Sequence, residues 1–225
     1  MSPNRKARSL RSRDMGNRWK GAAGQRFSEG WPLSLRNCLI SSKCVTRFIS
    51  FVFKCTSSVQ CPQPTNAYFG QKDIQQALLL RRLVGDLHLS HPTPDHLHIV
   101  PTARDATSGL ALSSRNVYLT PAERQLAPAF YAALQDAARA WASGASKRET
   151  VQCALERLEG AREEGERDHG VEIRVDYVEM NDPDSLEVLG DEQVRRSDGA
   201  AVILSGAVWF GRTRLIDNMI LGNLS

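Results

Sequence analysis

The sequence predicts an α/β protein in which a parallel βαβ unit is followed by a small α+β domain. Three observations support this: a strand, helix, strand order between residues 67 and 100, two helix-capping boxes at residues 120 and 146, and alternating apolar residues from residue 171 onward. We divide the chain into a basic leader (1–60), an α/β part (61–116) and an α+β domain (117–225).

The βαβ unit follows from periodicity and from breakers. Residues 67–69 end a strand that Gly70 breaks, and residues 97–100 form a second strand closed by Pro101. Between them a helix is predicted over residues 73–87, with Ala77, Leu80 and Val84 at helical spacing. This order implies parallel strands, and ligands of such sheets bind where the strands end.

The α+β domain is predicted from capping chemistry and alternation. Residues 120–123 (TPAE) and 146–149 (SKRE) are capping boxes, so they start two helices, with Gly144 as a stop between them. After a charged turn at 162–169, alternation over 171–177 indicates a half-buried strand. Two further strands, 200–204 and 207–210, are joined through Ser205 and Gly206, and 215–221 forms a last short element. The expected domain is a helical hairpin on an antiparallel sheet.

Charge separates the leader from the rest of the chain. Residues 1–60 hold twelve Lys or Arg against Asp14 and Glu29, a balance of +10, so residues 61–225 carry about −6 of the total +4. We favour a disordered or non-native leader; an organelle transit peptide and a nucleic-acid-binding arm are the alternatives. Its most apolar run, 48–53, is too short to span a membrane, and the five cysteines form no C-x-x-C pair. We expect no membrane or nucleic-acid partner, no bound metal and a reducing, cytoplasmic location, with the mitochondrion as the alternative.

Two segments place polar residues where a ligand of a parallel sheet would bind. Residues 69–76 read FGQKDIQQ at a strand-to-helix junction, where exposed N–H groups and Lys72 suit a phosphate. Residues 109–116 read GLALSSRN, and the hydroxyls and the Arg115 guanidinium suit a polyphosphate. Each has an ordinary explanation when taken alone: a solvated lysine with Asp73 as an N-cap, and a Ser/Asn-rich linker.

Together the segments resemble the pantothenate synthetase (pantoate–β-alanine ligase) family. Residues 64–76 resemble its FGEKD-x-QQ segment, and 101–104 (PTAR) with 109–116 resemble its PT-x-R-E-x-x-G-L-A-x-SSRN segment. Residues 177–179 (YVE) and 211–218 (GRTRLIDN) resemble two motifs of its C-terminal domain. The resemblance covers about residues 63–221 in the family's order. It implies a partial Rossmann-like nucleotide-binding domain of the HIGH superfamily followed by a small α+β lid domain.

The resemblance also implies a reaction and its residues. The family condenses (R)-pantoate with β-alanine through a pantoyl adenylate, using ATP and Mg²⁺ and releasing AMP and pyrophosphate; it is usually dimeric. Lys72, Ser113, Ser114 and Arg115 match its catalytic residues, and Gln76 matches its pantoate-binding glutamine. The positions that match its nucleotide-binding residues are Gly70, Gln71, Lys72, Asp73, Ala103, Leu112, Ser113, Ser114 and Arg115. Residues 213–218 are expected to be structural, with Asp217 fixing a turn.

The sequence departs from the family at one motif. The P-T-M-G-x-L-H-x-G-H loop, whose histidines polarise the ATP phosphates, is absent from the 225 residues, and all five histidines follow Lys72. We therefore interpret the chain as an N-terminally truncated or aberrant version with weak or no ligase activity, and with poor solubility unless it pairs with another subunit. The alternative is a catalytically silent paralogue that serves as an interaction or regulatory subunit. A related adenylyltransferase with another acceptor fits less well, because Gln75-Gln76 and the SSRN segment are retained.

Overall fold

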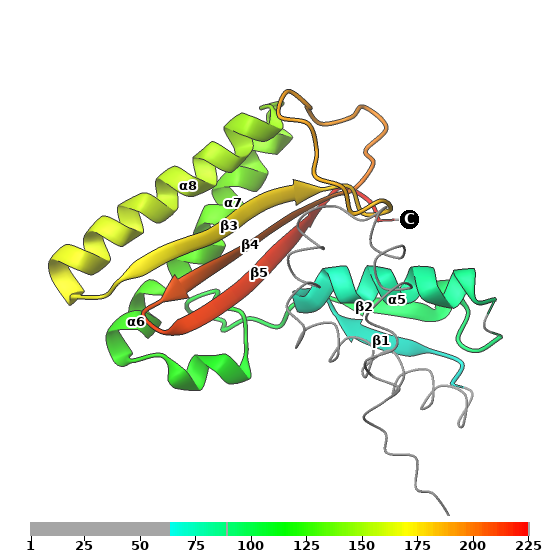
Figure 1. The fold of residues 1–225 in the computed structure, drawn as a ribbon, viewed down its shortest axis with the longest axis horizontal. Coiled ribbons are helices and arrows are strands. Elements are labelled where there is room, and N and C mark those ends of the chain that lie inside the picture. Colours follow the sequence, from blue (N-terminus) through cyan, green and yellow to red (C-terminus); the bar gives the residue numbers. More distant parts are fainter. Residues whose placement is uncertain (1–63, 89, 225) are drawn as a thin grey trace, which may run out of the picture. The chain divides into compact units, whose positions relative to one another are not determined.

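The computed structural model of the protein describes residues 64–88 and 90–224. The predicted leader, 1–60, lies outside the described residues, and so do four of the five cysteines. The described chain forms a two-stranded parallel sheet and a three-stranded antiparallel sheet (Figure 1). The mixed α/β class predicted from the sequence is therefore confirmed.

The βαβ unit contains β1 (Ala67–Gly70), η1 (Gln71–Asp73), α5 (Ile74–Asp86), η2 (Pro94–His96) and β2 (Leu97–Val100). The two strands pair in parallel, with Ala67 opposite Leu97 and Gly70 opposite Val100. Helix α5 covers them because Leu80 and Val84 pack with Leu97 in one buried cluster. The predicted strands, helix and parallel pairing are all confirmed.

The predicted first helix of the hairpin is divided in two. After η3 (Ser114–Tyr118), α6 (Pro121–Leu126) begins at the Thr120 capping box, and α7 (Pro128–Ala142) follows. The division falls at Pro128, which lacks the N–H that a continuous helix would need. The buried residues of the two helices include Leu126, Phe130, Leu134, Ala137 and Trp141, which lie at helical spacing.

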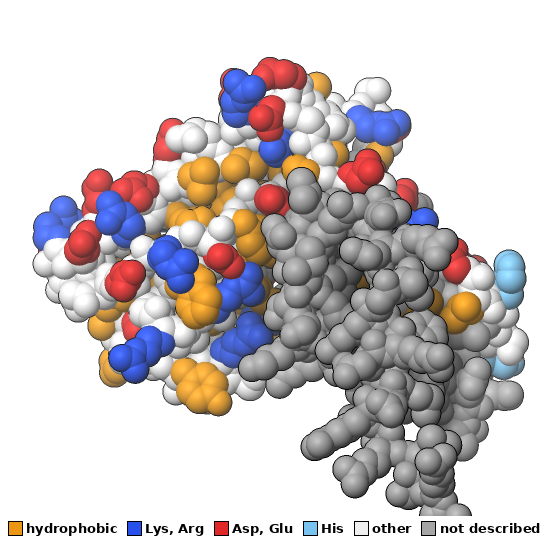
Figure 2. All heavy atoms as spheres, in the orientation of Figure 1, with side chains coloured by type: hydrophobic (Ala, Val, Ile, Leu, Met, Phe, Trp, Pro, Cys, Tyr) orange, Lys and Arg blue, Asp and Glu red, His pale blue; other side chains and the backbone are white. Residues whose placement is uncertain are grey.

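Helix α8 (Lys147–Glu164) starts at the second capping box and extends further than the sequence suggested. The predicted charged turn at 162–169 is wrong: α8 continues into η4 (Gly165–His169), a π-helix that ends at Gly170 in the left-handed conformation. The charges lie along the helix, since Arg162 pairs with Glu159 and Glu166 one turn away on either side. Figure 2 shows charges of both signs mixed over this region.

The antiparallel sheet has the order β3 (Ile173–Asn181), β4 (Val202–Phe210), β5 (Thr213–Leu221). The two strands predicted at 200–204 and 207–210 are one strand, because Gly206 lies within β4 and forms no turn. A Cβ built there would lie 3.1 Å from Cε2 of Phe130 and 3.1 Å from the carbonyl oxygen of Tyr177. Gly206 therefore allows α7 to approach the sheet closely.

One main core lies between this sheet and the helical hairpin. Helices α7 and α8 cover the same face of the sheet (Figure 1), where Leu134 and Leu158 of the helices meet Met180, Leu204 and Phe210 of the strands. All five side chains are almost fully buried. No helix in the described part of the chain has both the length and the apolar character that crossing a membrane requires.

The close packing at Gly206 yields a stability prediction. Gly206→Ala should lower the free energy of unfolding by about 1–3 kcal/mol, because the new methyl group forces Phe130 or the β3 backbone to move. The control is Gly160→Ala in α8, where nothing lies within 4 Å of the built Cβ; it should stabilise the protein by about 0.5–1 kcal/mol. Urea denaturation followed by circular dichroism measures both, and equal effects would contradict the packing role.

Candidate functional site

The end of β1 turns directly into η1 and thereby presents Lys72. Gly70 is extended there and a Cβ would meet nothing within 4 Å, so no close backbone approach demands the glycine. Asp73 occupies the N-cap position of α5 but makes no capping hydrogen bond with its side chain. The alternative explanation of Asp73 as an ordinary side-chain cap is therefore not supported.

The segment after β2 folds back on itself between residues 103 and 112. Arg104 and Ala111 form an antiparallel bridge, and the N–H of Leu112 donates to the carbonyl oxygen of Ala103 at 2.8 Å. Gly109 allows the reversal because its φ is +73°, and Asp105 stabilises the turn by accepting hydrogen bonds from the backbone N–H groups of nearby residues. Ala103 is thus held next to the GLALSSRN segment.

That segment ends in η3, whose first residues are held by three hydrogen bonds. The Ser113 hydroxyl accepts a hydrogen bond from the N–H of Arg115 at 3.2 Å, and the buried Asn116 donates to the carbonyl oxygen of Ala111 at 3.0 Å. Arg115 donates to the carbonyl oxygen of Arg214 in β5 at 3.5 Å. The Ser114 and Arg115 side chains remain exposed to solvent.

The strongest interaction of the site joins Arg104 to Asp217 of β5. The guanidinium donates to both carboxylate oxygens, at 2.6 and 2.9 Å, and also to the carbonyl oxygen of Gly109 at 3.3 Å. It stacks on Tyr131 of α7, with 3.4 Å from Cζ to the ring centroid. Only 18% of the Arg104 side chain and 4% of the Asp217 side chain are exposed. This ion pair is therefore largely shielded from water.

The next residue of β5, Asn218, contacts the lysine segment. Its amide donates to the carbonyl oxygens of Gln71 at 2.9 Å and Lys72 at 3.1 Å, and its own oxygen accepts from the Gln71 amide at 3.2 Å. Two adjacent residues of β5 thus hold two separate segments: Asp217 binds Arg104 after β2, and Asn218 binds Gln71 and Lys72 after β1.

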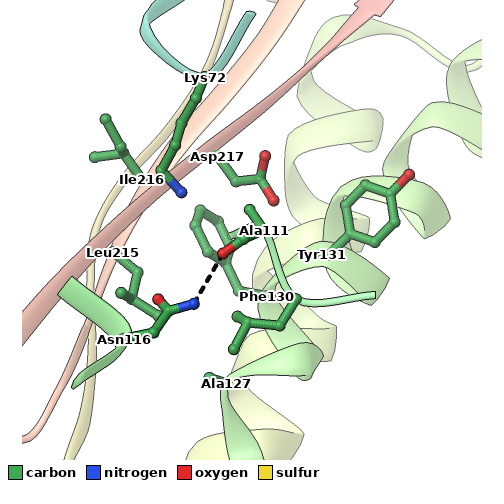
Figure 3. A pocket seen from close by; sticks show the side chains of 10 residues that line it. Lys72, Ala111, Asn116, Ala127, Phe130, Tyr131, Leu215, Ile216 and Asp217 are labelled. Carbon is green, nitrogen blue, oxygen red and sulfur yellow. Dashed lines mark hydrogen bonds between the residues drawn. The ribbon is translucent and has the colours of Figure 1, made fainter. Parts of the chain in front are cut away.

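Lys72 extends toward this network and lies beside Asp217 (Figure 3). Burial lowers the pKa of Lys72, and the positive charges of Arg104 and Arg115 lower it further, while Asp217 and Asp73 act in the opposite direction. Lys72, Ala111, Asn116 and Asp217 line one pocket. Its volume of about 10 Å³ holds at most one water molecule, so it is a packed junction and not a ligand cavity.

Of the predicted site residues, Lys72 lines the pocket, together with Ala111 and Asn116, which flank the 112–115 segment. The charge of Arg115 lowers the Lys72 pKa, and Ala103 is hydrogen-bonded to Leu112. Gln76 lies in the first turn of α5, and neither it nor Gly70 lines the pocket. A larger, open hollow of about 390 Å³ next to Tyr131 is lined by none of the predicted residues.

The roles of two residues, Arg104 and Asp217, were missed or misassigned from the sequence. Arg104 lies in a segment that carries the family resemblance, but no role was predicted for it. Asn218 was expected to be structural, and it hydrogen-bonds to the η1 backbone. The expectation that Asp217 fixes a turn is wrong, because Asp217 lies inside β5 and pairs with Arg104. No local pattern marks these contacts, since the paired residues are more than 110 positions apart.

The described residues offer no ready-made cation site. Among residues 64–88 and 90–224 there is no group of three or more His, Cys, Asp or Glu side chains that could hold a metal ion. Asp217 is already engaged by Arg104, and Asp73 is the other carboxylate close enough to influence Lys72. The described side chains therefore do not form a site for a protein-bound metal.

Fold and site together define a class: an α/β protein with an attached α+β domain, in which a lysine at a strand-to-helix junction contacts the residues that flank a Ser-Ser-Arg segment. The comparisons with known proteins identify the family. Residues 36–220 match the model of the pantoate–β-alanine ligase family. The chain belongs to this family.

Individual relatives agree with this assignment. The chain is 42% identical to pantothenate synthetase from Moorella thermoacetica over 71% of its own length and 50% of the relative's. It is 41% identical to a bifunctional pantoate ligase/cytidylate kinase from Synechococcus, over 71% of its length and 26% of that protein. The crystal structure of pantothenate synthetase from Thermus thermophilus superposes with a TM-score of 0.60 at 36% identity, covering 75% of this chain and 54% of that one. The chain thus spans about half the length of the synthetases it matches.

The shielded ion pair yields a second stability prediction. Asp217→Asn should lower the free energy of unfolding by about 3 kcal/mol, because it leaves the Arg104 charge in a largely buried place without its partner. Asp176→Asn breaks a comparable contact with Arg214, where about a third of each side chain is exposed, and should cost less than about 1 kcal/mol. Urea denaturation at neutral pH compares them; a similar small loss in both would show that the buried pair contributes little.

Proposed function

We propose that this chain carries part of the active site of an ATP-dependent pantoate–β-alanine ligase, the part that contacts the phosphates of ATP. One observation carries the proposal: Lys72 lines one junction with Ala111 and Asn116, the residues on either side of the 112–115 segment, and the charge of Arg115 acts on Lys72. Lys72, Arg104 and Arg115 place three positive charges near two carboxylates, Asp217 and Asp73. The excess of positive charge favours an anionic ligand.

The proposed chemistry has two steps. The pantoate carboxylate attacks the α-phosphorus of ATP, forms pantoyl adenylate and expels pyrophosphate; the β-alanine amine then attacks the acyl carbon, forms the amide and expels AMP. Both steps need negative charge on the phosphates to be neutralised and two small substrates to be held in line. Lys72 and Arg115 would supply charge, and the Ser113 and Ser114 hydroxyls would donate to phosphate oxygens.

The small volume of the junction places limits on where a nucleotide would bind. A triphosphate is far larger than about 10 Å³, so it would lie against the exposed Ser114 and Arg115 side chains, with Lys72 moving outward to meet it. Gly70, Gln71, Asp73, Ala103 and Leu112 would line the nucleotide, and Gln76 would contact pantoate. Mg²⁺ would enter as part of the MgATP substrate, coordinated mainly by phosphate oxygens.

The alternative is a catalytically silent paralogue that acts as an interaction or regulatory subunit. We also propose that the protein is a cytoplasmic homodimer and that its domain boundary lies at residues 116/117.

Pantoate-dependent exchange of label between pyrophosphate and ATP distinguishes the ligase from the silent paralogue. Any exchange above that of Lys72→Met supports the ligase, whereas ATP binding without exchange supports the silent paralogue.

Nucleotide binding tests the site directly. Lys72→Met should weaken MgATP binding by about tenfold or more, because one charged contact to phosphate contributes about 1.5–3 kcal/mol. The control is Lys147→Met, which removes the other lysine of the described residues, one that pairs with Asp191. Isothermal titration calorimetry at two salt concentrations measures both. Equal affinities for the two variants would refute the assignment of Lys72.

A further inference from the structure

Asn218 directs all its side-chain hydrogen bonds to a segment far away in sequence. It lies in β5, with 2% of its surface exposed, yet none of its three amide contacts is to its own sheet. Two of them hold consecutive carbonyl oxygens, those of Gln71 and Lys72. Because these residues form the short 3-10 turn η1, which has no side-chain cap of its own, Asn218 stabilises the backbone from which the Lys72 side chain starts.

Asn218 is also joined to Asp217 and through it to Arg104. Its backbone N–H donates to Oδ1 of Asp217 at 2.9 Å, and the same oxygen accepts from Arg104 at 2.9 Å. Asp217 in turn faces the Lys72 ammonium from the side of β5 (Figure 3). One pair of neighbouring residues thus holds the Lys72 backbone and faces the charged end of its side chain.

We propose that Asn218 is a positioning residue for Lys72: it fixes the η1 backbone so that the lysine amine stays at the junction lined by Asp217 of β5 and by Ala111 and Asn116. The role of that amine toward phosphate rests on the proposed function, but its placement does not. A purely structural role for Asn218 would add stability without affecting the environment of Lys72. A positioning role must affect both.

The environment of the amine supplies the readout. The pKa of Lys72 lies below its ordinary value of 10.5, mainly because the amine is buried. The charged groups that face it are Asp217, Asp73, Arg104 and Arg115. When Asn218 no longer holds η1, Lys72 should swing into water, and its pKa should rise toward 10.5.

The experiment compares two buried asparagines in the full chain. Asn181 of β3 is likewise 2% exposed and donates to one backbone carbonyl, that of Leu186, far from η1 in the sequence. Neutral alanine variants are used because an aspartate at 218 would raise the pKa of Lys72 by its charge alone. The Lys72 pKa is measured from the pH dependence of amine acylation, followed by mass spectrometry of the Lys72 peptide.

Asn218→Ala should raise the Lys72 pKa and weaken MgATP binding about three- to tenfold, the equivalent of one or two hydrogen bonds. Asn181→Ala should lower the melting temperature but leave the Lys72 pKa unchanged. An unchanged Lys72 pKa in a folded Asn218→Ala protein would overturn the proposal. If that variant does not fold, Gln71→Ala, which removes the reciprocal hydrogen bond, replaces it and should shift the pKa in the same direction by less; no shift would again overturn it.

The two proposals can fail separately. If the wild-type chain binds no MgATP, the proposed function is wrong, and the acylation titration still decides whether Asn218 positions the amine. If MgATP binds and Lys72→Met weakens it but Asn218→Ala changes neither quantity, the phosphate site stands and the positioning role is lost.

Discussion

The site depends on the ion pair between Arg104 and Asp217. Removing two charges from water is costly, and this pair meets the cost with several contacts at once. Both carboxylate oxygens accept from the guanidinium, which also bonds to Gly109 and stacks on Tyr131. The pair therefore ties together the folded-back segment, α7 and β5. Asn218, through its backbone N–H, extends the same network to the start of α5.

Helices and strands that are determined by neighbouring residues were predictable from the sequence. The hydrogen-bond network around Arg104 and Asp217 was not. The two capping boxes were recognised because a hydroxyl and a glutamate three residues apart satisfy each other, and both boxes form as expected. The βαβ unit followed from periodicity and from Pro101. By contrast, Arg104 and Asp217 are separated by 113 residues, and each sits in an ordinary local pattern. Their contact exists only because α7 and β5 pack around it.

Two predictions were wrong for the same physical reason: the break between strands at Gly206 and the charged turn at 162–169. In each case one type of residue occurs in two different structural settings. Glycine marks turns, but it also marks close packing, and at position 206 the Phe130 ring explains its presence. Charged runs are typical of exposed loops, but the charges at 162–166 bond along a helix. Of the candidate site, Lys72 and the Ser-Ser-Arg segment were found through family resemblance. No sequence pattern indicated that the junction beside Lys72 is as small as about 10 Å³, because its size depends on how distant elements pack.

The residues around Lys72 come from two parts of the chain, and this determines whether nucleotide affinity or turnover is the better measurement of the site. The side chains that meet Lys72 come from both sides of the predicted boundary at residues 116 and 117, so the phosphate site would be built jointly by the βαβ unit and the α+β domain. Turnover in the proposed ligase would depend on contacts that form only in the transition state as well as on this site. Losing one donor of such a contact reduces turnover by about 10²–10³ in well-studied enzymes, whereas ground-state binding through Lys72 and Arg115 would suffer far less. Nucleotide affinity therefore reports on this site even where turnover is too slow to detect.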